Sequence, residues 1–206
     1  MDNSELKIGL VGLGYWGKNI ARNLCELGRL NAICDSNLSS LNRYKDIYTG
    51  IKTFSDVDDL ISSNIDAIFI ATPAITHASL VRTALEKGIH VFVEKPLCLE
   101  VSDGKSLKQL ADRKGLKLMV GHLLLYHPAF IALKELILTG GLGNIRYIYS
   151  NRLSLGKLRK EENALWSFAP HDISMILALV KSEPILVEAS GGFYLNKNVA
   201  DTTITF

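Results

Sequence analysis

The stretch from Gly9 to Leu24, "GLVGLGYWGKNIARNL", places three glycines within six residues where an apolar run gives way to a helical pattern. In a dinucleotide-binding turn the first glycine allows the tight bend out of the strand, and the second lets the backbone approach the pyrophosphate. The third lets helix and strand pack closely, and the amino end of the helix offers N–H groups to the phosphates. Gly12, Gly14 and Gly17 therefore predict a dinucleotide site, with an ordinary tight turn as the alternative.

An acidic residue after the next predicted strand supports the dinucleotide site. Asp35 lies 18 residues after Gly17, and Ser36 and Asn37 follow it without an adjacent arginine. A carboxylate at this point accepts hydrogen bonds from the adenosine ribose hydroxyls and repels a 2′-phosphate. We therefore expect NAD in preference to NADP.

Strand and helix patterns alternate through the first 120 residues. Strands are predicted at Lys7–Val11, Leu30–Cys34, Lys52–Phe54, Ala67–Ala71, His90–Val93 and Lys117–Gly121. Between them, "THASLVRTALEKG" has a helix start at Thr76 and a stop at Gly88, and "SDVDDLISS" has Ser55 and Asp58 in capping-box spacing. This alternation predicts an α/β fold, a doubly wound parallel sheet of Rossmann type, over residues 1–122.

The pattern changes after residue 122. A helix over "HPAFIALKELILTGGLG", an exposed-faced strand over "NIRYIYSNRLSLG" and a helix over "PHDISMILALVK" are predicted, followed by strands in "ILVEASGGFYL" and "TTITF". This order predicts a partial α+β substrate or oligomerisation domain over residues 123–206, with an antiparallel or mixed sheet. Because the chain ends in a predicted strand with an open edge, we expect a truncated domain and a homo-oligomer formed through its sheet.

Bulk properties exclude several classes of protein. The 206 residues are 48% hydrophobic and 21% charged, which is enough for a packed core, and a net charge of +2 is too small for a nucleic-acid footprint. The N-terminus lacks a leader pattern, and no apolar run is long enough to span a membrane, so we expect a soluble cytoplasmic protein. Three widely spaced cysteines and five histidines contain no ligand-spaced pair, so no disulfide, zinc or other metal site is predicted.

Two further stretches follow strands, where the ligand crevice of such a sheet lies. In "IATPAITHA", Ala71, Thr72 and Pro73 leave a path of small residues for a cofactor, and His77 is either a helix-start residue or a ligand contact. In "VFVEKPL", Glu94 and Lys95 are either a surface ion pair or part of the site.

The motifs "GLGYWG", "ATPAITHA", "EKPL", "VGHLLLYHPA" and "LWSFAPHDISM", in this order, resemble the Gfo/Idh/MocA family of NAD(P)-dependent oxidoreductases. The likeness is greatest to the branch that acts on nucleotide-linked or amino sugars in surface-polysaccharide synthesis. The resemblance implies that Lys95 hydrogen-bonds the reacting hydroxyl and the cofactor, and that His171 is the general base or acid. A neutral imidazole suits the proton and a fixed cation suits the developing alkoxide. Without the resemblance, His171 would be interpreted as a capping or core histidine.

One departure from the family pattern concerns catalysis. Many relatives carry an aspartate four residues before this histidine, where the present chain has Ser167. A serine hydroxyl can orient the imidazole but adds no charge. Two functions are therefore considered: a dehydrogenase that transfers a hydride between a sugar alcohol and NAD, and a catalytically silent NAD(H)-binding remnant of such an enzyme.

The remaining candidates depend mainly on the resemblance. Trp166 is interpreted as a wall over the nicotinamide or a core residue, and Arg152 and Lys157 as contacts to a substrate diphosphate or solvated surface cations. His122, Tyr126, His127 and Pro128, which lie in and around "LLLY", either face the substrate and cofactor or pack the domain joint. The expected cofactor contacts are Gly12, Gly14, Tyr15, Trp16, Gly17, Asp35, Ser36, Ala71, Thr72, Pro73, His77, Glu94, Lys95, Pro96 and Trp166. The expected substrate contacts are His122, Tyr126, His127, Arg152 and Asp172.

Overall fold

A computed structural model describes residues 6–153, 163–180, 182–195 and 197–205. By their contacts the residues fall into two units, Met1–Gly121 and His122–Phe206. Lys157, for which a diphosphate contact was considered, lies outside the described residues. Among the helices that are described, none has the length and apolarity that a membrane crossing requires.

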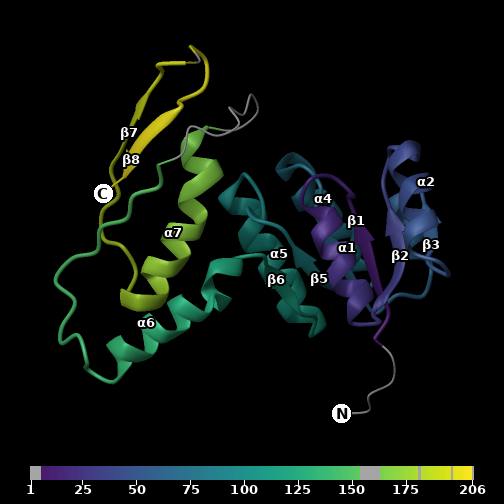
Figure 1. The fold of residues 1–206 in the computed structure, drawn as a ribbon, viewed down its shortest axis with the longest axis horizontal. Coiled ribbons are helices and arrows are strands. Elements are labelled where there is room, and N and C mark those ends of the chain that lie inside the picture. Colours follow the sequence, from purple (N-terminus) through teal and green to yellow (C-terminus); the bar gives the residue numbers. More distant parts are fainter. Residues whose placement is uncertain (1–5, 154–162, 181, 196, 206) are drawn as a thin grey trace. The chain divides into compact units, whose positions relative to one another are not determined.

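The first unit is built on a six-stranded parallel sheet in the order β3-β2-β1-β4-β5-β6 (Figure 1). The order reverses between β1 and β4, which is the topological switch point where α/β sheets bind ligands at the carboxyl ends of their strands. The predicted Rossmann sheet is confirmed, with each strand within a residue of its expected bounds. The strands are β1 (Ile8–Val11), β2 (Leu30–Cys34), β3 (Lys52–Phe54), β4 (Ala67–Ile70), β5 (His90–Val93) and β6 (Leu118–Val120).

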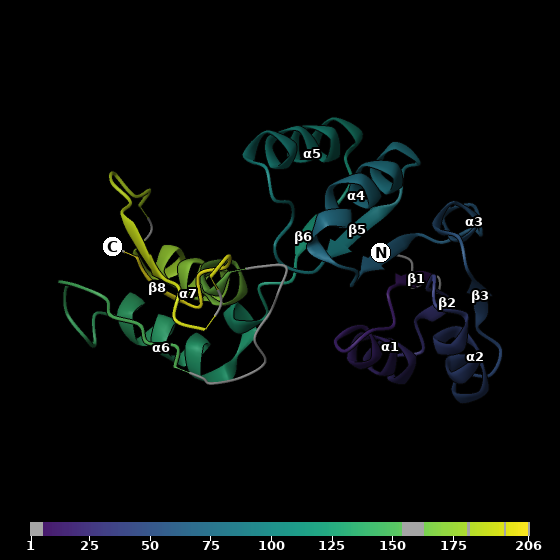
Figure 2. The ribbon, with the colours of Figure 1, turned by 90° about the horizontal axis from the view of Figure 1, so that it is seen from above.

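Helices cover both faces of this sheet. Figure 2 shows α1 and α2 on one face and α3, α4 and α5 on the other. Each face has its own apolar cluster: Leu10 and Ile33 lie in the first, and Ile68 and Leu85 in the second, and all four side chains are fully buried. The sheet is therefore a buried platform whose ends, and not its faces, are open to ligands. The helices are α1 (Gly17–Glu26), α2 (Leu38–Ile47), α3 (Val57–Ile61), α4 (His77–Glu86) and α5 (Val101–Lys114).

The local signals that begin these helices agree only partly with prediction. Asp56 and not Ser55 is the N-cap of α3, because its carboxylate accepts the backbone N–H of Asp58 at 2.7 Å. Thr76 does precede α4, after the short 3-10 turn η1 (Ala74–Thr76), but its hydroxyl donates to the Pro73 carbonyl oxygen and makes no side-chain cap bond. The predicted N-cap, Ser55, is therefore one residue before the observed one, because the carboxylate of Asp56 is the acceptor that reaches the first turn.

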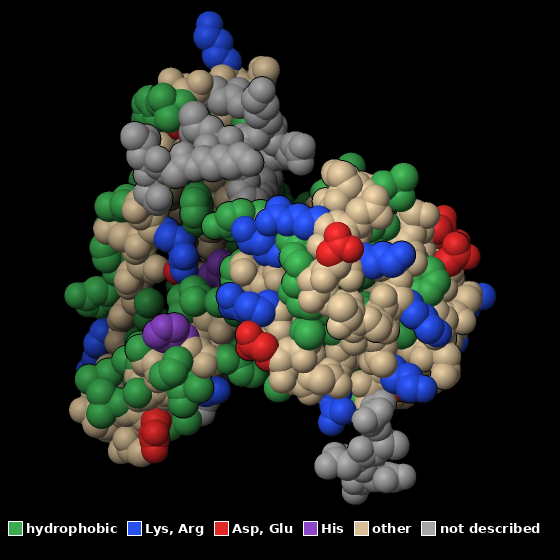
Figure 3. All heavy atoms as spheres, turned by 45° about the vertical axis from the view of Figure 1, so that its right-hand side comes forward, with side chains coloured by type: hydrophobic (Ala, Val, Ile, Leu, Met, Phe, Trp, Pro, Cys, Tyr) green, Lys and Arg blue, Asp and Glu red, His purple; other side chains and the backbone are tan. Residues whose placement is uncertain are grey.

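The second unit pairs helices with a small antiparallel sheet. Its elements are η2 (Leu123–Tyr126), α6 (Pro128–Leu138), α7 (Ala164–Val180), β7 (Ala189–Gly192) and β8 (Thr202–Thr205). β7 and β8 are antiparallel, as expected for this part of the chain. Many of its apolar side chains are exposed, including Ile131 and Leu136 on α6 and Ile173 on α7. Figure 3 shows hydrophobic side chains gathered at the surface of this unit.

Two predictions for this unit were wrong. The strand expected over residues 144–156 is absent from its described part, because residues 145–153 form no ladder of backbone hydrogen bonds with a neighbouring strand. The helix expected to begin at Pro170 begins at Ala164, so Pro170 lies inside α7 and His171 is a residue of the helix interior and not of its first turn.

Candidate active site

Two of the three glycines of the first loop are required by the local geometry, and the third stands in open space. Gly12 has φ +92°, and a side chain there would place its Cβ 2.6 Å from the carbonyl oxygen of Ala71. A Cβ at Gly17 would lie only 1.9 Å from the carbonyl oxygen of Gly12, so strand and helix pack closely there. A Cβ at Gly14 would meet nothing within 4 Å. The middle glycine therefore leaves open space beside the loop.

The acidic residue after β2 is held against the same loop. One oxygen of the Asp35 carboxylate, Oδ2, accepts the backbone N–H of Leu13 at 2.7 Å, and the other, Oδ1, accepts that of Asn37 at 2.8 Å. Each carboxylate oxygen has two lone pairs, so both can still accept from a ligand hydroxyl. Asp35 is half-buried, while its neighbour Ser36 is exposed. The hydrogen bond from Leu13 therefore fixes the position of the Asp35 carboxylate relative to the glycine loop.

The residues after β4 lie beside the glycine loop. Ala71 donates its backbone N–H to the Val11 carbonyl oxygen at 2.8 Å, and the hydroxyls of Thr72 and Thr76 are 2.7 Å apart. The side chain of His77 is buried, with Nδ1 2.6 Å from the Pro96 carbonyl oxygen and Nε2 2.9 Å from that of Thr72. These contacts join the segment after β4 to the segment after β5.

Glu94 and Lys95 directly follow β5, and the Lys95–Pro96 peptide bond is cis. The indole Nε1 of Trp16, at the start of α1, donates to Oε1 of Glu94 at 2.7 Å. Burial raises the pKa of Glu94, whereas the hydrogen bond from Trp16, a backbone hydrogen bond and the positive charge of Lys95 act in the opposite direction. The half-buried Lys95 therefore lies at the sheet edge that also carries the glycine loop.

The structure thus brings most expected cofactor residues to one edge of the first unit. The residues present fit a dinucleotide. A Cβ at Gly14 would meet no atom, the ten-residue helix α1 begins directly after the loop, and the carboxylate of Asp35 follows the next strand. Tyr15 is largely exposed, and Lys18 lies over its ring with Nζ 5.2 Å from the ring centroid. Trp166 belongs to the second unit, on α7.

In the second unit, α7 carries Ser167 and His171 one turn apart, so the two side chains share a face of the helix. Ser167 is buried and His171 is half-buried. The carbonyl oxygen of His171 accepts the Ser174 hydroxyl at 2.7 Å. A proton-transfer role for His171 is compatible with this placement, because its ring is not part of a helix cap.

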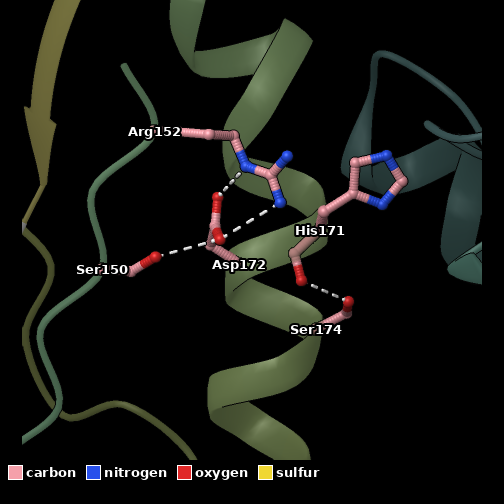
Figure 4. Close-up of polar contacts among 5 residues, drawn as sticks. All are labelled: Ser150, Arg152, His171, Asp172 and Ser174. Carbon is pink, nitrogen blue, oxygen red and sulfur yellow. Dashed lines mark hydrogen bonds and ion pairs between the residues drawn. The ribbon is translucent and has the colours of Figure 1, made fainter. Parts of the chain in front are cut away.

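Asp172 is held by the segment that precedes α7. Its carboxylate accepts hydrogen bonds from the Ser150 hydroxyl at 3.0 Å and from Nε of Arg152 at 2.8 Å. Figure 4 shows Asp172 and His171 projecting from different sides of α7, with Asp172 toward Ser150 and Arg152. The predicted substrate residues Arg152 and Asp172 are therefore paired with each other.

The remaining substrate candidates lie at the start of the second unit. His127 is the N-cap of α6, where its Nδ1 accepts the backbone N–H of Ala129 at 3.2 Å. Tyr126 is exposed at the end of η2, and His122 is half-buried before it. A capping function for His127 was not predicted, although a residue before proline at a helix start is a recognisable signal.

Sequence reasoning missed the contacts that connect these segments. The bonds from Trp16 to Glu94, from His77 to Pro96 and from Ser150 to Asp172 join residues 78, 19 and 22 positions apart. Local spacing carries no signal for such pairs, which become visible only once the chain is folded.

Comparison with known proteins gives a family match. Residues 6–122 match the model of the oxidoreductase family with an NAD-binding Rossmann fold, Gfo/Idh/MocA. The UDP-N-acetylglucosamine 3-dehydrogenase of Acidithiobacillus ferrooxidans is 29% identical over 190 residues, which is 91% of this chain and 58% of that protein. Its solved structure has a TM-score of 0.87 at 28% identity and is covered over 62% of its length by 97% of this chain.

A second solved structure is that of the WlbA dehydrogenase from Bordetella pertussis in complex with NADH and UDP-GlcNAcA. It has a TM-score of 0.82 at 27% identity, over 98% of this chain and 66% of that one. The inositol 2-dehydrogenase of Rhizobium meliloti is 26% identical over 95% of this chain and 61% of its own length. The chain thus spans about three fifths of the length of the curated relatives it matches.

Proposed function

We propose a function from one premise: this chain belongs to the Gfo/Idh/MocA oxidoreductase family, which has an NAD-binding Rossmann fold. The proposed reaction is hydride transfer between a secondary alcohol of a nucleotide-linked sugar and a nicotinamide cofactor, and the names of two relatives, which contain UDP-sugars, support this substrate class. The observation that carries the proposal is that the glycine loop, Asp35 and Lys95 meet at the carboxyl edge of one parallel sheet.

We propose NAD in preference to NADP as the cofactor. The carboxylate of Asp35 keeps lone pairs for the ribose hydroxyls and repels a 2′-phosphate. In this proposal the Gly12 to Gly17 loop and the amino end of α1 hold the pyrophosphate. The bound nicotinamide supplies the hydride chemistry, and the protein holds and orients the reacting carbon.

Lys95 and His171 are proposed as the catalytic pair. Oxidation of an alcohol releases a proton, which a neutral imidazole at His171 can accept, while the ammonium group of Lys95 stabilises the alkoxide as it forms. Lys95 belongs to the first unit and His171 to the second, so their action on one substrate is part of the proposal.

The substrate is proposed to contact the second unit, through His122, Tyr126, His127, Arg152 and Asp172, and Trp166 to lie against the nicotinamide. Arg152 is already paired with Asp172, so in this proposal the pair presents a partly neutralised guanidinium to a substrate anion. The nucleotide sugars in the relatives' names are consistent with a role in polysaccharide biosynthesis.

A silent NAD(H)-binding protein is the second candidate. The observation that favours it is Ser167, which lies one helical turn before His171, at the position where many members of the Gfo/Idh/MocA family have an aspartate. A hydroxyl cannot stabilise the charged imidazolium as a carboxylate does.

We further propose a cytoplasmic homo-oligomer. The described cysteines, including the buried Cys34, are free thiols, as in reducing compartments. The two-stranded sheet of β7 and β8 leaves edges open and many apolar side chains of the second unit are exposed, which association through this sheet would cover.

The test is NADH formation by the purified chain with NAD or NADP and a panel of UDP- and dTDP-linked hexoses, amino sugars and uronates. Wild type, Lys95→Ala and His171→Ala are compared. His90→Gln is the matched control, since His90 begins β5 at the opposite edge of the sheet.

We expect turnover with NAD on at least one sugar, lost in Lys95→Ala and His171→Ala and retained in His90→Gln. Tight NADH binding with no turnover on any sugar would establish the silent protein. Turnover that survives in His171→Ala would show that this histidine is not the base.

A further inference from the structure

His77 is a polar side chain that the described part of the chain buries almost completely, with 1% of its surface exposed. It begins α4 and lies between the segments that follow β4 and β5. Its two ring nitrogens face two backbone carbonyl oxygens, that of Pro96 at 2.6 Å and that of Thr72 at 2.9 Å. Both distances are within hydrogen-bond range.

The identity of the two partners determines how many protons the ring must carry. A carbonyl oxygen can only accept a hydrogen bond, and a neutral imidazole has one N–H. In the neutral form one nitrogen of His77 would turn a lone pair toward the lone pairs of a carbonyl oxygen, at a distance too short for a water molecule to lie between them. Two hydrogen bonds require the imidazolium form.

Three effects oppose a charge at His77 and two support it. Burial and the positive end of α4 disfavour a cation. Hydrogen bonds from a charged donor are stronger than neutral ones, and an imidazolium at His77 would make two of them, at the distances given above. The carboxylate of Glu94 would also attract a charge on His77, while the Lys95 ammonium is the nearby like charge on the same segment and would repel it.

We propose that His77 is a positioning residue, held as a doubly protonated imidazolium that ties the Thr72 carbonyl to the Pro96 carbonyl and so fixes Lys95 beside the segment after β4. His77 then acts on the cofactor site through the backbone and does not touch the cofactor. Its importance for Lys95 rests on the proposed function, whereas its charge state does not.

The charge state can be measured directly by NMR of protein labelled with 15N-histidine, from long-range couplings that report the protonation of each ring nitrogen. We expect both nitrogens of His77 to carry a proton at neutral pH. His90 is the internal control, because its Nδ1 accepts the backbone N–H of Lys117 at 3.0 Å and must therefore be unprotonated.

Signals are assigned from single variants of the five histidines. If a His77 variant fails to fold, the four other variants assign His77 by elimination. A neutral His77 at neutral pH, in a spectrum that shows His90 as the Nε2–H tautomer, would overturn the imidazolium.

The positioning role is tested by NADH affinity, measured by isothermal titration on folded His77→Gln. A glutamine carries its donors on one nitrogen and cannot reach both carbonyl oxygens. We expect binding at least tenfold weaker than wild type. The matched control is Thr83→Ala on the same helix, which loses the hydrogen bond from the Thr83 hydroxyl to the Ser79 carbonyl oxygen, and it should bind as wild type does.

A folded His77→Gln protein that binds NADH within twofold of wild type would overturn the positioning role. This readout does not use turnover. A wild-type chain that binds NADH but oxidises no sugar would contradict the proposed dehydrogenase, while weak NADH binding by His77→Gln in the same preparation would still support the inference.

Discussion

Alanine at Gly14 and alanine at Gly17 should separate cofactor binding from folding. A Cβ at Gly17 would lie 1.9 Å from the Gly12 carbonyl oxygen, so backbone must move by more than about 1 Å to reach ordinary contact. Overpacking that displaces backbone costs about 3 kcal/mol, which lowers the midpoint of thermal unfolding by on the order of 10 °C. Gly14→Ala meets no neighbour within 4 Å, so its stability should stay within about 0.5 kcal/mol of wild type.

For NADH affinity we expect the reverse: Gly14→Ala should weaken binding although it hardly changes stability. If the backbone at Gly14 approaches the pyrophosphate, a methyl group there costs at least about 1.4 kcal/mol, or tenfold in Kd. Calorimetric unfolding and isothermal titration of the two variants measure both quantities. Wild-type NADH affinity in Gly14→Ala would refute the placement of the pyrophosphate at this loop, and wild-type stability in Gly17→Ala would refute the close packing of β1 on α1.

Further expectations concern other parts of the chain. Ser167→Asp should raise turnover, because a carboxylate stabilises the charged imidazole one turn later, and an unchanged or lower rate of NADH formation would count against this. Burial raises the pKa of Cys34 from 9.0 to about 12, so iodoacetamide at pH 8 should label exposed Cys25 and leave Cys34 intact in the folded protein. The Cys34 thiol of the unfolded chain ionises at a lower pH than that of the folded protein, so the free energy of unfolding should fall as pH rises from about 9 to about 12. Asp172→Ala should cost about 1–2 kcal/mol and speed hydrogen exchange around Arg152, since three hydrogen bonds are lost.

The first unit could be predicted because its information is local. The four central strands, β2, β1, β4 and β5, are largely buried on both faces and therefore read as short apolar runs. The spacing of the glycines in the first loop is likewise a local signal. Asp56 was missed as the cap of α3 because Ser55 beside it has an equally suitable side chain, and only the backbone direction decides between them.

The second unit was harder to predict because its signals depend on partners. Residues 145–153 alternate like a strand, but a strand exists only where a neighbour completes its hydrogen bonds, and none does so among the described residues. Pro170 suggested a helix start because proline lacks the N–H that a helix interior needs, yet α7 continues through it. The pairing of Arg152 with Asp172 likewise depends on two segments that spacing does not connect.

The hydrogen bond between Trp16 and Glu94 makes Trp16 an intrinsic fluorescent probe of this part of the protein. The sequence has two tryptophans, and the indole N–H of Trp16 donates to the half-buried carboxylate of Glu94 beside Lys95, while 41% of the surface of Trp16 stays exposed. A Trp166→Phe protein would carry a single fluorophore, at the junction of the glycine loop and the segment after β5. Its emission colour and quenching would then follow events in the crevice in real time, including those in variants that turn over no substrate.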